Sequence, residues 1–382
     1  MEIKFGLISA DSHAAFERDD FTSRMSVSKW GDRIPHVAEH ERDGERVDGW
    51  AIYDRPPRGD VCNCPAVMGD PFPHWPKRWE EVPKMAYDPH ERLKALDIDR
   101  VDAEVLFPNP PGGSYYQFGD VEFELDAIRA YNDILSDWVR VSDRYLPLVA
   151  IPYLSSPQTM TGEIQRAAEG GHRGINFAGR TPESLPHLTD PYWDPVWDVC
   201  QELGFPVHFH GSAGINVGKS SKEWSGYSTR QAHSASTSTS AVTPAQIMPQ
   251  LIFSGVTERF PRLKFAFAEA GIGGLNYVVA ACDHEWERRH LWTEGMSTRP
   301  SEIVHRQVYV NFWFEAEGIK LRDEIGVANL MWEADYPHVA SYYPNSWEAV
   351  ERVLDGVPED DRRKLLYENA LRVYQIKETV PA

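Results

Sequence analysis

The sequence predicts a single (β/α)8 TIM barrel, and three observations lead to that fold class. Short apolar runs alternate with longer amphipathic segments, an order typical of βα units built on a parallel sheet. Eight of these runs can be counted, which is the number of strands that closes a barrel. The chain has 382 residues, a length that suits a barrel with inserted loops. A doubly wound sheet is the alternative, because a strand count from one sequence can be wrong by about one or two.

The expected strands and helices follow each other along the chain. Strands are predicted at residues 5–10, 103–107, 146–152, 174–177, 205–210, 263–268, 308–312 and 329–334. Helices are predicted at residues 123–141, 157–169, 190–203, 245–257, 272–290 and 346–354, and the first of these has the clearest helical periodicity. All of them are expected to belong to one domain that spans residues 1–382.

Two stretches interrupt this alternation. Residues 20–90 are rich in Pro, Asp and Arg with scattered Trp and Phe, which predicts a long inserted loop region over the C-terminal face of the barrel. Residues 212–243 are small, polar and of low complexity. Long loops in compact domains are usually functional lids or disordered chain. We expect a lid that orders when substrate binds, with a solvated loop as an equally supported alternative.

Composition and charge restrict the partners of the protein. Lys and Arg number 39 and Asp and Glu 58, which gives a net charge of −19. Such a field repels phosphate backbones and anionic lipids, so we expect a small-molecule substrate and neither nucleic acid nor membrane. No apolar run reaches the roughly 18 residues of a membrane span. The N-terminus enters a predicted strand at once and the four cysteines form no disulfide framework, so a cytoplasmic location is expected.

Residues that bind metals or move protons follow four of the expected strands. They are Asp11 and His13 after the first strand, His208 and His210 after the fifth, Glu269 after the sixth, and Asp335 and His338 after the eighth. Barrel enzymes place their catalytic groups at these C-terminal strand ends. Each residue also has an ordinary structural role available, because a lone aspartate often caps a turn and a lone histidine is often a hydrogen-bonded core residue. Their occurrence at matching strand ends favours a metal site.

Strand geometry sharpens this prediction. Side chains two residues apart share a face of a strand, so Asp11 and His13 point the same way. A carboxylate and an imidazole can bind one divalent ion at about 2.0–2.2 Å. The fifth strand stands across the barrel from the first and the eighth lies beside it, so His210 and Asp335 are expected to complete the set of ligands.

The chain resembles the amidohydrolase-related family that includes aminocarboxymuconate-semialdehyde decarboxylase and γ-resorcylate decarboxylase. The motifs that carry the resemblance are ISADSH at 8–13, PVHFH at 206–210, SGVTERFPRLK at 254–264, WEADYPH at 332–338 and the C-terminal YENALRVY at 367–374. The resemblance spans nearly the whole chain and implies a metal-dependent enzyme on a barrel. It assigns the metal ligands to Asp11, His13, His210 and Asp335, with Asp11 standing where the family often has a histidine.

One position departs from the decarboxylase pattern. After the sixth strand the decarboxylases carry a His-x-Gly segment, whereas this chain has Ala268-Glu269-Ala270-Gly271. This change favours a hydrolase, in which a metal lowers the pKa of its bound water and Asp335 acts as general base. Glu269 or His208 would orient the water or a ligand. The bond that is cleaved would be that of an amide, that of a lactone, or a carbon–carbon bond next to a carbonyl.

Two alternatives stay open. In a metal-dependent decarboxylase of an aromatic or unsaturated acid, the metal would chelate the substrate carboxylate and Asp335 would protonate the carbon that loses carbon dioxide. The candidate substrate-binding residues are Arg180, Trp75, Trp79, Tyr115, Tyr116 and His338. A metal-free binding barrel with a vestigial polar cluster is the other alternative. We expect one divalent ion, with Zn²⁺ the first choice and Mn²⁺ or Fe²⁺ the others, and the family resemblance implies a homo-oligomer.

Overall fold

Eight parallel strands form one sheet in the computed structural model, which describes residues 1–42, 44–109, 111, 115–178, 185–210, 226, 228–238 and 242–379. The strands pair in the order β1-β5-β6-β7-β8-β9-β10-β11. Their bounds are β1 (Ile8–His13), β5 (Ala103–Phe107), β6 (Tyr145–Val149), β7 (Gly174–Asn176), β8 (Val207–His210), β9 (Phe265–Ala268), β10 (Val308–Phe312) and β11 (Leu330–Trp332). Each strand lies at or close to a predicted one, and the predicted (β/α)8 barrel is confirmed.

Helices separate most of the strands, as the sequence predicts. The longer ones are α3 (Pro89–Asp99), α4 (Val121–Val141), α5 (Pro157–Glu169), α6 (Asp194–Leu203), α7 (Thr229–Thr237), α8 (Val242–Phe253), α10 (Leu275–Arg288), α11 (Pro300–Gln307) and α14 (Ser346–Val353). The shorter ones are α1 (Val27–Trp30), α2 (Lys84–Tyr87), α9 (Val256–Arg259), α12 (Ala316–Ile319), α13 (Arg322–Ile325), α15 (Glu359–Arg363) and α16 (Asn369–Val373). None of the described helices is long and apolar enough to cross a membrane.

The chain divides into two compact units. The first unit comprises Met1–Ile175, Ala334–Ala349 and Lys377–Ala382, and the second comprises Asn176–Glu333 and Val350–Ile376. The predicted site residues belong to both units. The first unit contains Asp11, His13, Asp335 and His338, and the second contains His208, His210 and Glu269.

The first strand begins later than predicted. The sequence predicts a strand at 5–10, whereas β1 runs from Ile8 to His13. The backbone amides of residues 4–7 donate to the carboxylate of Asp102 at 2.7–3.1 Å instead of joining the sheet. Gly6 turns the chain there with a φ of 77°, a conformation that glycine adopts without strain. Asp11 and His13 therefore lie inside the strand rather than beyond its end.

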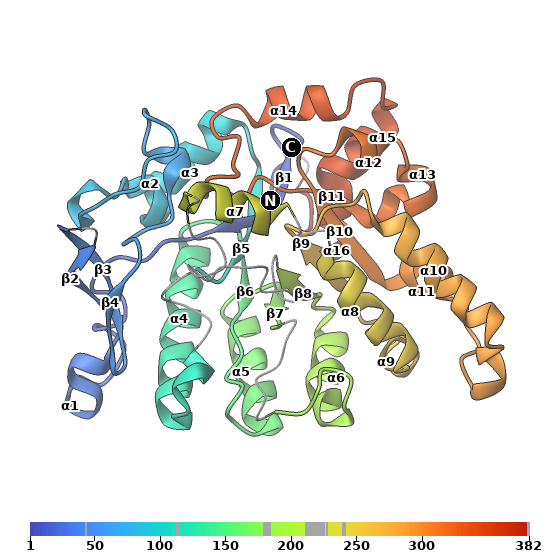
Figure 1. The fold of residues 1–382 in the computed structure, drawn as a ribbon, viewed down its shortest axis with the longest axis horizontal. Coiled ribbons are helices and arrows are strands. Elements are labelled where there is room, and N and C mark those ends of the chain that lie inside the picture. The colour runs from blue at the N-terminus through green and yellow to red at the C-terminus, as the bar shows by residue number, and fades with distance from the viewer. Residues whose placement is uncertain are drawn as a thin grey trace. The chain divides into compact units, whose positions relative to one another are not determined.

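The insertion at 20–90 contains regular structure where the sequence predicts a loop region. An antiparallel sheet of β2 (His36–Arg42), β3 (Glu45–Ile52) and β4 (Arg55–Arg58) lies in it, blue at left in Figure 1. Trp50 on β3 packs edge-on against both Phe21 and Trp79. This aromatic cluster gives the insertion a small core of its own.

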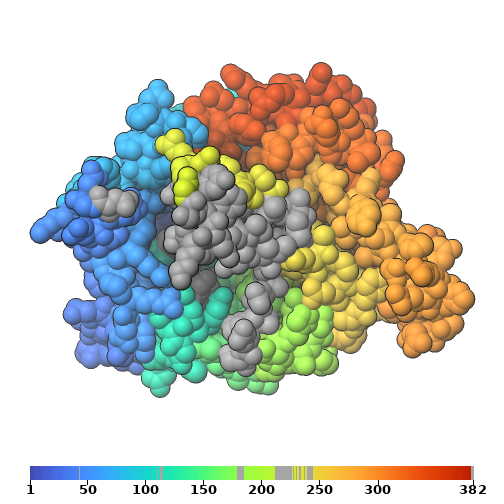
Figure 2. Space-filling model, viewed as in Figure 1, coloured from blue at the N-terminus to red at the C-terminus, as the bar shows by residue number. Residues whose placement is uncertain are grey.

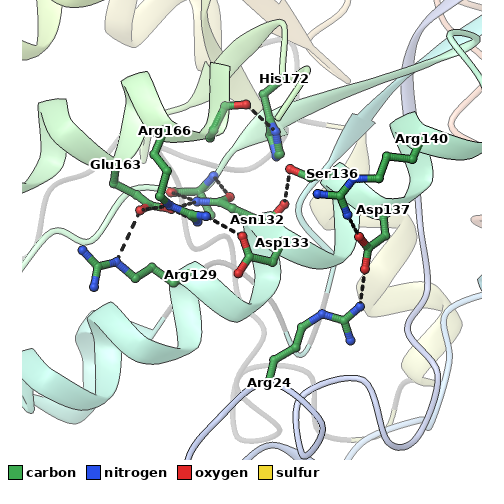
Figure 3. Close-up of polar contacts among 12 residues, drawn as sticks. Arg24, Arg129, Asn132, Asp133, Ser136, Asp137, Arg140, Glu163, Arg166 and His172 are labelled. Carbon is green, nitrogen blue, oxygen red and sulfur yellow. Dashed lines mark hydrogen bonds and ion pairs between the residues drawn. The ribbon is translucent and has the colours of Figure 1, made fainter. Parts of the chain in front are cut away.

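A buried carboxylate joins α4 to α5 in the first unit (Figure 3). Glu163, whose side chain is fully buried, accepts hydrogen bonds from Asn132 at 2.8 Å and from Arg166 at 2.7 and 2.8 Å. The Asn132 side chain also bonds to the backbone N–H and C=O of Ala150, just past β6. Because removing one partner of a buried ion pair leaves an uncompensated charge, this network fixes the two helices against the sheet.

The second unit contains β8, β9, β10 and β11 as neighbouring parallel strands. The C-terminal segment with α16 packs on them, since the Asn369 side chain donates to the carbonyls of Val327 and Leu330 at 2.7 and 2.8 Å. The end of α10 and the following turn Leu291–Glu294 form an exposed edge of this unit, orange at right in Figure 2. The predicted lid at 212–243 falls mostly outside the described residues, which include α7 and the start of α8 from it.

Candidate metal centre

Backbone hydrogen bonds hold the segment after β11 against the end of β1 in the first unit. The N–H of Asp335 donates to the carbonyl of Asp11 at 2.9 Å, and the N–H of His13 donates to the carbonyl of Tyr336 at 2.7 Å. Ser12 and Tyr336 pair as in a parallel sheet. The first and last parts of this unit therefore present their polar side chains at one place.

Asp335 lies between two imidazoles. Its Oδ1 atom is 3.2 Å from Nε2 of His13 and 3.0 Å from Nδ1 of His338. The two rings stack with their centroids 3.9 Å apart. Oδ1 of Asp11 lies 3.5 Å from the same Nε2 of His13. Asp11, His13 and Asp335 are all at most 2% exposed, so this cluster is enclosed by protein.

The electrostatic balance keeps Asp335 ionised. Burial alone raises the pKa of this carboxyl, but the neighbouring His338 and His13 imidazoles outweigh burial and hold the pKa well below its usual range. The residue also has a φ of 48°, in the left-handed region. A non-glycine residue in this conformation costs about 1–3 kcal/mol and is found preferentially at functional sites.

The side chains of this cluster fit a divalent cation. His13, Asp335 and His338 each offer one ligand atom, and the three atoms lie within 4.8 Å of one another. Asn109 Oδ1 is 3.4 Å from Nε2 of His338. In a neutral His338 ring whose Nε2 carries the proton, the lone pair of Nδ1 faces the Asp335 carboxylate. Two electron-rich atoms at this distance repel each other unless a proton or a cation lies between them. Nitrogen and oxygen donors of this kind suit zinc, manganese or iron. His338, which the sequence assigns to substrate binding, thus has ligand geometry.

A second polar group lies in the second unit. Nδ1 of His210, at the end of β8, is 3.8 Å from Oε2 of Glu269. The backbone N–H of Glu269 donates to the carboxylate of Glu333 at 3.1 Å. Glu333 is fully buried, and this hydrogen bond holds the backbone at Glu269. Glu269 has a φ of 48°, like Asp335. The residues after β9 and β11 therefore share the same strained backbone.

His208 takes a different place from His210. Its Nε2 atom lies 3.0 Å from the hydroxyl of Tyr374, and the two rings stack in parallel. Its side chain is fully buried. This contact ties β8 to the C-terminal segment, which is a structural role, whereas the sequence suggests that His208 orients a reacting group.

The predicted substrate-binding aromatics occupy different environments. Trp79 is 8% exposed and packs between Trp50 and Tyr87, so it belongs to the core of the insertion. Trp75 is half-buried and donates to Asn63, and Tyr116 packs edge-on against Tyr153. Arg180 lies outside the described residues.

A cavity of about 460 Å³ lies in the first unit. Its apolar walls include Trp50, Tyr115 and Phe118, and its polar walls include Arg58 and Asn109. One of its lining residues, Asn109, also contacts the cluster, because its Oδ1 atom lies 3.4 Å from Nε2 of His338. Of the four aromatics predicted from the sequence, Tyr115 is the one that lines it.

Three residues of the cavity and the cluster were not predicted from the sequence. They are Arg58 and Asn109, which line the cavity, and Arg92, whose guanidinium donates to the His13 carbonyl at 3.0 Å. Asn109 lies two residues past β5, so a search past the end of every predicted strand would have found it. No sequence signal marks Arg58 or Arg92.

Known proteins are similar to this chain over most of its length. The amidohydrolase family model matches residues 67–376. The 2-amino-3-carboxymuconate-6-semialdehyde decarboxylase of Dictyostelium discoideum is 24% identical over 300 residues, which are 76% of this chain and 75% of that protein.

Solved structures share the fold. An amidohydrolase from Mycobacterium avium subsp. paratuberculosis K-10 superimposes with a TM-score of 0.74 at 19% identity, over 97% of this chain and 98% of that one. The dihydroxybenzoic acid decarboxylase of Polaromonas sp. JS666, solved with bound manganese and the inhibitor 2-nitroresorcinol, gives a TM-score of 0.64 at 18% identity, over 99% of this chain and 98% of that one.

Proposed function

The chain belongs to the amidohydrolase family, and we propose that it is a metal-dependent, non-oxidative decarboxylase of an aromatic or unsaturated acid. Two of the similar proteins named above are decarboxylases, one of them of a dihydroxybenzoic acid. In the sequence analysis, decarboxylation is the alternative to hydrolysis, which Glu269 favours there. The observation that carries the proposal is the link from the Asp335–His338 pair through Asn109 to a cavity with aromatic walls and one arginine.

The cavity has the chemistry of a site for a planar anion. Trp50, Tyr115 and Phe118 supply flat apolar surface. Arg58 forms no ion pair among the described residues, although the chain carries a net charge of −19. An unpaired guanidinium in such a chain is suited to bind a substrate carboxylate through two parallel hydrogen bonds.

We assign the divalent ion to Asp11, His13 and Asp335 of the first unit, whose side chains lie together there. When bound, the ion supplies Lewis-acid stabilisation of negative charge on the substrate oxygens. Manganese joins zinc as a first choice, because a solved decarboxylase of this fold contains it.

The residues of the chain then have separate tasks in the reaction. Arg58 holds the carboxylate, and the aromatic walls hold the ring and exclude water. When the carbon–carbon bond breaks and carbon dioxide leaves, its electron pair stays on the ring carbon, which must receive a proton. We assign this proton to Nε2 of His338, because that atom faces the cavity residue Asn109 and Asp335 stabilises the charged imidazole.

The reaction is tested with the metal-loaded protein and a panel of hydroxybenzoic acids in deuterated water. We expect carbon dioxide release and one deuterium at the vacated ring carbon. Hydrolysis remains the second candidate because Glu269 lies beside His210, so the same preparation is assayed with amides and lactones. Turnover of a lactone or amide without release of carbon dioxide from any acid would reject the decarboxylase proposal in favour of hydrolysis.

A further inference from the structure

Arg92 is a fully buried arginine with no solvent contact. It lies on α3, and its Nε and Nη2 atoms donate to the two carboxylate oxygens of Glu104 on β5, each at 2.8 Å. Glu104 is equally buried. A buried charge is costly to desolvate, and a two-bond ion pair of this geometry offsets that cost.

The same guanidinium reaches both backbone segments of the metal cluster. Nη2 donates to the carbonyl of His13 at 3.0 Å and to the carbonyl of Tyr336 at 3.4 Å. Its central carbon lies 3.8 Å from the centroid of the Tyr336 ring, within cation–π range. One rigid, planar group therefore contacts β1 and the segment that follows Asp335.

The Arg92 contacts lie at backbone positions that are at the end of a regular strand or outside one. His13 is the last residue of β1, and Tyr336 pairs with Ser12 outside any regular strand. The guanidinium bonds to both carbonyls from fixed positions, because its donors lie in one plane. Since Glu104 neutralises Arg92, the pair adds no net positive charge that would repel a cation at the cluster.

We infer that Arg92, held by Glu104, is a positioning residue that sets the spacing between His13 and Asp335 and so the affinity of the metal site. This inference rests on the metal site of the proposed function. It assigns no chemical step to Arg92, which acts on the ligands through their backbone. Partners that orient metal ligands typically change metal affinity by about 10–100-fold when they are removed.

A matched control separates positioning from general stabilisation. Glu163 is as deeply buried as Glu104 and likewise accepts two bonds from one arginine (Figure 3). It joins α4 to α5, and its hydrogen bonds and ion pairs within the described part of the chain go to Asn132, Arg166 and Arg129 rather than to the cluster. Glu104→Gln and Glu163→Gln therefore remove the same kind of interaction, one beside the cluster and one away from it.

The experiment titrates metal-free protein with Mn²⁺ and measures free Mn²⁺ by electron paramagnetic resonance. We expect Arg92→Lys and Glu104→Gln to weaken Mn²⁺ binding by about 10–100-fold. Glu163→Gln should lower the unfolding temperature about as much as Glu104→Gln and leave the Kd unchanged. The visible spectrum of the Co²⁺ form should change with Arg92→Lys, because its band intensities report coordination geometry.

Wild-type affinity in Arg92→Lys or Glu104→Gln would overturn the inference, and so would an equal loss in Glu163→Gln. Should Arg92→Lys not fold, the comparison of Glu104→Gln with Glu163→Gln decides. A wild-type protein that binds no metal would contradict the proposed metal site itself. A wild-type protein that binds Mn²⁺ but releases no carbon dioxide would contradict the proposed reaction and leave the positioning test valid.

Discussion

The Oδ1 atom of Asp335 lies 3.0 Å from Nδ1 of His338, whose other ring nitrogen faces the side chain of Asn109. His338 thus stands between an ionised buried carboxylate and the wall of the cavity. This position suits a proton carrier, because the carboxylate stabilises the charged ring and the opposite nitrogen faces a residue of the cavity wall.

The first prediction concerns His338. His338→Asn should lower kcat by about 10²–10⁴-fold, the usual contribution of a positioned proton donor, and the metal content should stay at the wild-type level. Metal analysis beside steady-state kinetics checks both results. Loss of the metal in this variant would instead make His338 a ligand, as its distance to His13 and Asp335 also permits.

Arg58 should act on substrate binding. Replacing it in Arg58→Gln removes a charge-assisted hydrogen bond worth about 1.5–3 kcal/mol, so KM should rise by about 10–100-fold with kcat nearly unchanged. Arg46→Gln is the control, because Arg46 lies on the same small sheet and is likewise exposed, but it is paired with Glu39 and does not line the cavity. Equal kinetics of the two variants would show that the cavity is not the substrate site.

Tyr374 should affect stability alone. Tyr374→Phe removes the hydroxyl that lies 3.0 Å from His208, which should lower the free energy of unfolding by about 1–2 kcal/mol. Because this contact joins β8 to the C-terminal segment, kcat and metal content should not change. A fall in kcat beyond about tenfold at full metal occupancy would restore the catalytic role that the sequence predicts for His208.

Glu124 should make stability depend on pH. It is buried on α4 and accepts hydrogen bonds from the N–H groups of Tyr153 and Leu154. Burial raises the pKa of this carboxyl from 4.5 to about 7. The folded state therefore holds a proton that the unfolded state releases, and stability is complete below about pH 4.5 and falls as the pH rises through 7.

The Glu124→Gln variant isolates this contribution. The glutamine stays neutral, so the variant should gain about 3 kcal/mol relative to the wild type between pH 4.5 and pH 8. Urea unfolding of both proteins at the two pH values measures the difference. A stability difference that is the same at both pH values would contradict a raised pKa for Glu124.

The sequence predicts the strands of the barrel and the residues at their ends because both depend on local patterns. Apolar runs such as 103–107 define their own strands. Asp11, His13 and Asp335 follow from their places in or beside strands. The start of β1 was predicted three residues too early, because Asp102 takes the amides of residues 4–7 and no local pattern reveals that partner.

The parts that were missed depend on distant partners. Strand β2 is mostly half-buried or exposed and rich in charge, so it lacks the alternation that marks a strand. Arg92 lies on a helix, where an arginine normally indicates a solvated face. Its partners stand 12, 79 and 244 residues away in the chain, and only the folded structure brings them together. The alternation of side chains along a strand predicts that His208 and His210 share one face of their strand, but it does not predict that His208 contacts Tyr374.

Metal content measured on protein purified without added metal tests the central claim most directly. We expect about one manganese, zinc or iron per chain in the wild type and a loss of most of it in Asp335→Asn, because this carboxylate is an assigned ligand and lies 3.2 Å from the assigned ligand His13. Asp133→Asn, which changes an aspartate on α4 paired with Arg166, should retain the wild-type amount. Absence of metal from the wild type, with none bound after Mn²⁺ or Zn²⁺ is added, would contradict a metal centre and make the metal-free binding barrel the leading explanation.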